Sequence, residues 1–406
     1  MINISVDYYK DIEKDLFKHY PNYKAINALV NGCKSIQKGE LLAYMIFTEQ
    51  KDRPGFRTYD ELKQRVSDRL GDINDYFDFS HGSISAKFIG NEMDKNIIER
   101  LGVGLGLSVI GKLHNLIGAD WKRIPEFAGK NACRTFDFDY DIPFASDGER
   151  FIQVENKGSS VDNNLRKPST ISQHYGSIKK KKESIDNNRL DYNYGTIGIV
   201  DNNSNHVAKL LLVDPPSDFI DIEPKKYKLL ARLNYYLEEF TNIGVKKKIS
   251  VALAKRIKEI SDSSDYTKFN NEPLDYKYPV PYHLFMEGNM FAAIDHNEAF
   301  GTFFTIENKN EIFPYVLAYP KALMKLILYQ RFDDILTYRY DPDFIMEKVN
   351  ILLRIGKKAE VDLGIIEKLG FQLSERRGRY FEASYYCNVS HSLSGRLFGR
   401  LSNFKE

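Results

Sequence analysis

The stretch FDFDYDIPFASDGERFIQVENKGS, residues 136–159, contains two segments with the periodicity of β-strands, separated by a tight turn. Large apolar residues alternate with aspartates in its first half, so Asp137, Asp139 and Asp141 share one face of a strand. The segment SDGE is typical of a turn, and RFIQVENKG at 150–158 predicts a second strand that pairs with the first. The sequence therefore predicts a β-hairpin with an acidic first strand.

Glu155 and Lys157 occur two residues apart in the second strand, so both are expected on the same side of the sheet. If the aspartates share that side, several carboxylates and one ammonium group converge there. Crowded carboxylates repel one another unless a cation lies among them, and oxygen ligands favour Mg²⁺ or Mn²⁺. Such an ion activates water, and a lysine beside it stabilises developing negative charge. The pattern indicates metal-assisted phosphodiester hydrolysis; a surface strand with an ordinary ion pair is the alternative.

The triplet Glu-Asn-Lys occurs a second time, at residues 307–309, in different surroundings. The preceding residues supply Asp295 but no acidic strand. The residues NKN at 308–310 lie between the runs FFTIE and EIFPYVLAY, which predicts a hairpin turn with Lys309 at its solvated tip. We therefore expect the first triplet, and not the second, to form a site.

The elements expected around the hairpin complete an α/β unit over residues 94–218. One helix is expected at 94–116, with Asp94 as its N-cap, and another at 168–185. Two apolar runs, YGTIGIVD and HVAKLLLVDPP, predict two further strands after the second helix.

Three glycines, Gly102, Gly104 and Gly106, occur within the first of these helices. They do not follow a strand, as the glycines of a dinucleotide-binding loop would. We expect them instead to let this helix pack closely against a neighbouring element.

This arrangement resembles the PD-(D/E)XK, or restriction-endonuclease-like, nuclease superfamily. The resemblance rests on an aspartate in one strand, a short hairpin and a hydrophobic-Glu-x-Lys sequence in the next strand, followed by Gly158 and Ser159. The two helices also occur where the αβββαβ core of that superfamily has them. The first strand of this outline would fall near residues 120–135, and no proline precedes the aspartate as in the superfamily's namesake spelling.

The resemblance implies that Glu155 is a metal ligand and that Lys157 is the catalytic lysine. Asp139 is the first choice for the aspartate that shares the metal, because it leaves a full strand and turn before Glu155. Asp141 is the second choice, and Asp137 stays open.

Further residues of the site follow from the same resemblance. Some members add an acidic residue of the first helix to the metal site, which corresponds to Glu99, and some carry a glutamine on the second helix, which corresponds to Gln173. His174 is expected to be an ordinary helix residue. The basic run after it is expected either to contact nucleic-acid phosphates or to be a solvated helix end; it comprises Lys179, Lys180, Lys181 and Lys182.

The length of 406 residues and mass of 47.0 kDa predict two or three packed units. We expect a mostly helical N-terminal region at 1–93, a nuclease core at 94–218 and a mixed α/β C-terminal region at 219–406. In the last region, helices are expected over KYKLLARLNYYLEEFTNIG, VALAKRIKEIS, PKALMKLILYQRFDDILTY and DFIMEKVNILLRIGKK, with strands over 276–316 and in the tail. The fold class is therefore α/β (α+β).

Composition excludes several kinds of protein. The 58 basic and 56 acidic residues nearly balance, so net charge does not by itself indicate a nucleic-acid partner. The three cysteines are widely separated, which fits a reducing cytoplasm and argues against a disulfide framework. We also expect no secretory signal and no membrane span.

The function predicted on these grounds is a cytoplasmic Mg²⁺-dependent (or Mn²⁺-dependent) endonuclease that acts on DNA. The resemblance implies a role in restriction or antiphage defence, with a homodimer or defence-complex subunits as partners; repair and mobile-element roles stay open. A non-catalytic nucleic-acid-binding or assembly protein that retains the fold and an RNA-directed nuclease are the alternatives.

Overall fold

The computed structural model describes most of the chain and divides it into two compact units, Met1–Pro54 with Asp68–Ala231 and Gly55–Ser67 with Arg232–Glu406. No helix within the described segments combines the length and apolar character that a membrane crossing requires. The described residues are 1–47, 59–80, 82–122, 141–145, 148–162, 169–180, 192–214, 223–275, 290–294, 299–308, 311–340, 346–356, 372–373 and 380–402.

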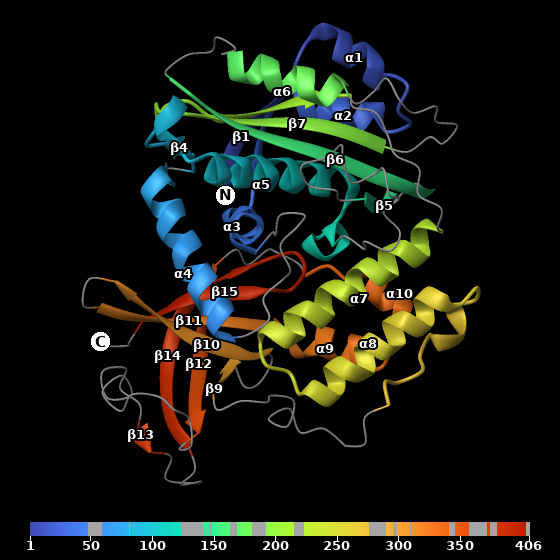
Figure 1. Ribbon diagram of the computed structural model, residues 1–406, viewed down its shortest axis with the longest axis vertical. Helices are drawn as coiled ribbons and strands as arrows, with labels where there is room; N and C mark the ends of the chain where they lie inside the picture. The colour runs from blue at the N-terminus through green and yellow to red at the C-terminus, as the bar shows by residue number, and fades with distance from the viewer. Residues whose placement is uncertain are drawn as a thin grey trace. The chain divides into compact units, whose positions relative to one another are not determined.

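A mixed six-stranded sheet forms the centre of the first unit (Figure 1). Its strands run in the order β2-β1-β8-β7-β6-β5. The pairs β6–β7 and β1–β8 are parallel, and the other neighbouring pairs are antiparallel. The strands are β1 (Ile2–Tyr8), β2 (Cys33–Ile36), β5 (Asp141–Ala145), β6 (Gly148–Val161), β7 (Tyr192–Asp201) and β8 (Ala208–Val213).

Two helices cover opposite faces of this sheet, as Figure 1 shows. On one face lies α5 (Lys95–His114), where the Asp94 side chain accepts hydrogen bonds from the backbone N–H groups of Asn96 and Ile97. On the other lies α6 (Ser169–Lys180), which connects β6 to β7. Both helices and the N-cap were predicted from the sequence, and the β5–β6 hairpin was too.

The prediction that glycines allow close packing of α5 is confirmed. A Cβ atom on Gly102 would lie 2.4 Å from the Lys157 carbonyl oxygen, and one on Gly106 would lie 1.9 Å from Asn156 Oδ1. A Cβ on Gly158 of β6 would lie 1.9 Å from the Ile98 carbonyl oxygen of α5. The helix thus rests directly on the strand that carries the Glu-Asn-Lys triplet.

The N-terminal region is not a separate helical region, because it contributes β1 and β2 to the sheet of the first unit. Ile2, Ile4 and Val6 of β1 are buried, and β1 lies between β2 and β8, parallel to β8. The predicted boundary at residue 93 therefore falls inside one compact unit. The other elements of this part are α1 (Asp11–Phe17), α2 (Tyr23–Val30), α3 (Lys38–Phe47), α4 (Tyr59–Tyr76), β3 (Phe77–Asp78) and β4 (Ser85–Ala86).

The second unit contains a seven-stranded sheet in the order β12-β9-β10-β11-β15-β14-β13, and β12 also pairs with β14. Every pairing in it is antiparallel. The strands are β9 (Met290–Ile294), β10 (Ala299–Asn308), β11 (Glu311–Pro320), β12 (Met346–Gly356), β13 (Gln372–Leu373), β14 (Tyr380–His391) and β15 (Leu397–Ser402).

The helices of the C-terminal region are α7 (Pro224–Asn242), α8 (Lys247–Asp262), α9 (Lys321–Leu328) and α10 (Phe332–Thr337). Helices were predicted where α7 and α8 lie, and the one helix expected over PKALMKLILYQRFDDILTY is divided into α9 and α10. Strands were predicted in the tail. The helix expected over DFIMEKVNILLRIGKK was wrong, since this segment contains β12. Apolar residues at 349, 351, 353 and 355 alternate with period two, and strands β9 and β14 both pair with β12.

Candidate functional site

Glu155 and Lys157 form a buried ion pair on β6. Glu155 Oε1 lies 3.5 Å from Lys157 Nζ, and the two side chains are 0% and 8% exposed. The alternation of β6 directs Asn156 and Gly158 toward α5, so the charged pair belongs to the opposite face, the one under α6. The structure thus brings together the two residues predicted to form the centre of the site.

Asn156, the middle residue of the triplet, has a structural role that the sequence did not indicate. Its Oδ1 accepts a hydrogen bond of 2.7 Å from Thr196 Oγ1 on the neighbouring strand β7. The same amide lies against Gly106, where only a glycine leaves room for it. This contact fixes β6, β7 and α5 together at the residue between Glu155 and Lys157.

His174 of α6 is a neighbour of the pair that was not included in the predicted site. A carbonyl oxygen can only accept, so His174 Nε2–H donates to the Gly158 carbonyl across 3.1 Å. Burial lowers the pKa of His174, and the positive charge of Lys157 lowers it further. Helical periodicity could have placed it here, because Ile171 and Ile178 of the same helix are buried against the sheet.

The pairing of β5 with β6 shows on which face of the sheet position 141 lies. The Cα partner of Asp141 on β5 is Gln153 on β6. Directly paired positions share a face of the sheet, so position 141 belongs to the same face as Glu155. Asp137 and Asp139 lie outside the described residues, as does the side chain of Asp141.

Glu99 and Gln173 are not brought to the pair in the way expected. Glu99 lies on α5, which covers the other face of the sheet, and its ion pair is with Lys95 at 3.8 Å, one turn earlier. Gln173 is exposed on α6, next to His174, which takes the inward position. Helix phase explains the difference for Gln173, which lies on the solvent side of α6, whereas Glu99 is half-buried and pairs within its own helix.

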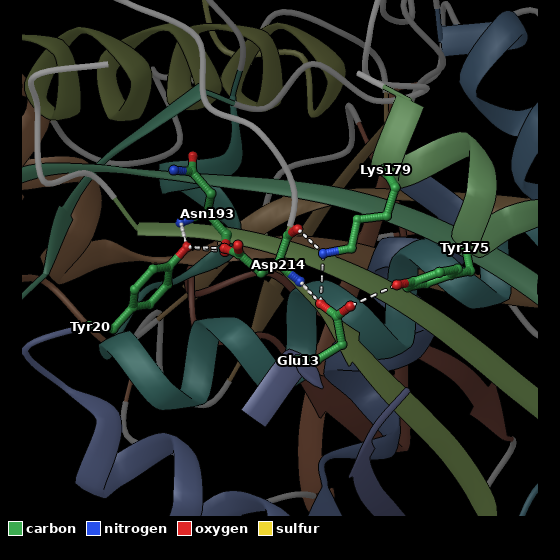
Figure 2. Close-up of polar contacts among 6 residues, drawn as sticks. All are labelled: Glu13, Tyr20, Tyr175, Lys179, Asn193 and Asp214. Carbon is green, nitrogen blue, oxygen red and sulfur yellow. Dashed lines mark hydrogen bonds and ion pairs between the residues drawn. The ribbon is translucent and has the colours of Figure 1, made fainter. Parts of the chain in front are cut away.

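Lys179 has an internal partner and does not lie at a solvated helix end. Its Nζ donates to Glu13 Oε2 and to the Asp214 carbonyl oxygen, each at 3.0 Å. Glu13 is fully buried and also accepts hydrogen bonds from the Tyr175 hydroxyl at 3.0 Å and from the Asp214 N–H at 2.8 Å. Figure 2 shows these contacts converging on the Glu13 carboxylate from α6 and from the residue after β8.

This network ties α6 to α1 and to the end of β8. Burial and the Glu13 carboxylate raise the pKa of Tyr175 to about 12, which keeps its hydroxyl a donor. A further contact in Figure 2 is made by Tyr20, whose hydroxyl lies 3.0 Å from Asp214 Oδ1. The network holds the helix that covers Glu155 and Lys157. The side chain of Lys180 and residues Lys181 and Lys182 lie outside the described residues.

The second triplet falls in the hairpin predicted for it. Asn308, the last residue of β10, pairs with Glu311, the first residue of β11. Lys309 lies outside the described residues. The two triplets therefore occur in different places, one in the interior of a strand and the other at a chain reversal.

Within the described segments, no three His, Cys, Asp or Glu side chains gather closely enough to hold a metal ion. The aspartates predicted to complete the site are not among the described side chains. No protein-family profile, curated protein or solved structure significantly matches the chain.

Proposed function

We propose that the chain is a Mg²⁺-dependent nuclease that hydrolyses the phosphodiester bonds of DNA, with a core related to the PD-(D/E)XK superfamily. The observation that carries this proposal is the buried Glu155–Lys157 pair, 3.5 Å apart on the face of β6 under α6. A carboxylate and an ammonium group two residues apart on a strand, beside an acidic hairpin partner, are the groups that metal-assisted phosphodiester cleavage requires.

The order of elements supports the proposal. α5 is followed by the antiparallel β5–β6 hairpin, and the crossover helix α6 then leads to β7, parallel to β6. This order matches the αβββαβ outline except for the first of its three consecutive strands. The remaining strand of the outline would fall near residues 120–135, of which residues 123–135 lie outside the described residues.

The burial of the charged pair also favours a chemical role. Removing two charges from water costs several kcal/mol per ion, and replacing such a pair with apolar residues is often neutral or stabilising. Stability alone therefore does not account for Glu155 and Lys157 in the sheet interior. Buried ionisable groups with a specific charge partner are characteristic of active sites.

The residues fit a Mg²⁺ ion by the chemistry of their donors. Glu155, with Asp141 or Asp139, would hold the ion, which when bound supplies Lewis acidity at a phosphate oxygen and acidifies a water ligand. The Lys157 ammonium group stabilises negative charge on the phosphate. His174 holds the backbone immediately after Lys157 through the Gly158 carbonyl.

The test is cleavage of double-stranded DNA, single-stranded DNA and RNA by the purified chain with Mg²⁺, with Mn²⁺ and with EDTA. We expect DNA to be cut with either metal and not with EDTA. Cleavage that persists in EDTA would eliminate the mechanism. Binding without cleavage would favour the non-catalytic alternative, and cleavage of RNA alone would favour the RNA-directed one. Restriction or antiphage defence is the setting that the superfamily resemblance suggests.

A further inference from the structure

Helix α6 runs back along the part of β6 that carries the Glu-Asn-Lys triplet. In its first turn, Thr170 Oγ1 lies 3.4 Å from Ser159 Oγ of β6. One turn later, His174 Nε2–H donates to the Gly158 carbonyl oxygen at 3.1 Å. These contacts place the first half of α6 over the residues of β6 that come directly after the triplet.

The last turn of α6 lies over the other end of the triplet. An added Cβ on Gly195 of β7 would lie 2.8 Å from Ile178 Cγ2, and Gly195 is the Cα partner of Glu155. Glu155 and Lys157 belong to this face of the sheet, so both lie beneath the helix. Their side chains are 0% and 8% exposed, which leaves no room for a DNA phosphate to contact either one.

Few apolar side chains attach α6 to the sheet. Ile171 and Ile178 are buried, and Tyr175 is partly buried against the same cluster. The outer side of the helix carries exposed polar residues such as Ser172 and Gln173. Elements with few buried apolar contacts open at a lower free energy than the whole protein unfolds. Polar contacts therefore contribute a large part of the stability that keeps α6 in place.

Two of these polar contacts are charge-assisted and end on Glu13 of α1, whose carboxylate is fully buried. Tyr175 donates to Oε1 and Lys179 donates to Oε2, each at 3.0 Å. Both donors belong to α6 and the acceptor belongs to another element, so these bonds break when α6 moves off the sheet. We call Glu13, Tyr175 and Lys179 the latch, and Figure 2 shows both bonds.

A closed latch and a catalytic pair that contacts DNA exclude each other. We propose that α6 is an autoinhibitory cover, and that cleavage proceeds from a minor population in which the latch is open and Glu155 and Lys157 are accessible. This rests on the proposed nuclease function, to which it adds a means of regulation. In such an equilibrium the observed rate is proportional to the open fraction, so a weaker latch raises the rate.

The test compares Tyr175→Phe with Tyr20→Phe in the full chain. Tyr175→Phe removes the hydroxyl that donates to Glu13 and keeps the ring, which stacks on Tyr9 at 4.1 Å. Tyr20→Phe is the matched control, because it removes a hydroxyl whose hydrogen bonds go to β7 and to the residue after β8, not to α6. Circular dichroism checks that both variants are folded.

The first measurement is the rate at which an amine-reactive ester acylates Lys157 in EDTA, followed by mass spectrometry of peptides. Loss of a hydrogen bond to a charged group shifts such an equilibrium about tenfold, so Lys157 should react about tenfold faster in Tyr175→Phe and at the wild-type rate in Tyr20→Phe. Lys95 is the internal reference, because its side chain is 87% exposed. Equal rates at Lys157 in Tyr175→Phe and the wild-type chain would overturn the proposal.

The second measurement is single-turnover cleavage of duplex DNA in Mg²⁺. We expect Tyr175→Phe to cut about tenfold faster than the wild-type chain, because its open fraction is larger, and Tyr20→Phe to cut at the wild-type rate. Lys179→Met removes the other donor of the latch and should also cut faster. Unchanged or slower cleavage by Tyr175→Phe would overturn the proposal, and so would an equal increase in the control.

Acylation in EDTA does not depend on catalysis, so the two proposals fail separately. Faster acylation of Lys157 in Tyr175→Phe, without metal-dependent cleavage by any variant, would leave α6 as a movable cover and remove the nuclease function. Metal-dependent cleavage with equal acylation rates would retain the nuclease function and remove the cover.

Discussion

Gly158→Ala is expected to force α5 away from β6 at the Glu-Asn-Lys triplet. The new Cβ would lie 1.9 Å from the Ile98 carbonyl oxygen, where ordinary contacts begin at 3.4 Å, so the two elements would have to separate by about 1.5 Å. The atoms that it meets belong to backbone and cannot rotate away. Overpacking of this kind costs about 1–3 kcal/mol, and we expect about 3 kcal/mol because a helix and a strand must both move.

Tryptophan fluorescence during urea unfolding reports on this unit directly, because Trp121 is the one tryptophan of the chain and is 3% exposed. With a slope of about 3 kcal/mol per M, a loss of about 3 kcal/mol lowers the unfolding midpoint by about 1 M.

Gly176→Ala is the matched control, because a Cβ on this α6 residue meets nothing within 4 Å. Alanine is preferred to glycine inside a helix by about 0.5–1 kcal/mol, so this variant should be slightly stabilised. An unchanged midpoint for Gly158→Ala, or an equal loss in both variants, would refute the packing described for α5.

Three further predictions concern other charged groups. Glu13→Gln removes the buried carboxylate that pairs with Lys179 and should cost about 3 kcal/mol by the same fluorescence assay; a wild-type midpoint would contradict the role of this network. Burial lowers the pKa of His391 to about 4. As pH falls from about 6.5 to about 4 the unfolded state binds the proton first, so the wild-type protein should lose about 3 kcal/mol that His391→Gln retains. The check is unfolding followed by circular dichroism at both pH values, and an identical pH dependence would count against it. At least one of Asp139→Asn and Asp141→Asn should abolish Mg²⁺-dependent cleavage, whereas full activity in both would remove this strand from the site.

Several elements of the first unit were predicted because their signals lie in residues close together in the sequence. The Asp94 cap, the strand alternation in RFIQVENKG and the glycines of α5 each depend on residues close together in the chain. The position of His174 was not predicted but could have been, because the phase of Ile171 and Ile178 places it toward the sheet.

Long-range pairing could not be predicted in this way. β1 joins the sheet beside β8, about 200 residues later, and a single strand has no signal for its partner. Lys179 was expected either to contact phosphates or to lie at a solvated helix end, because its partner, Glu13, lies 166 positions away in the chain. The period-two signal in β12 was missed because the segment is also rich in residues that favour helices.

The most direct test of the central claim compares cleavage of plasmid DNA in Mg²⁺ by Lys157→Met and by Lys309→Met. Both changes remove one ammonium group from a Glu-Asn-Lys triplet, and methionine retains most of the length of lysine. Circular dichroism confirms that each variant is folded. We predict that the folded Lys157→Met variant has lost cleavage while Lys309→Met cuts as the wild-type chain does. Cleavage retained by Lys157→Met and lost by Lys309→Met would place the site at the other triplet and contradict the role assigned to Lys157.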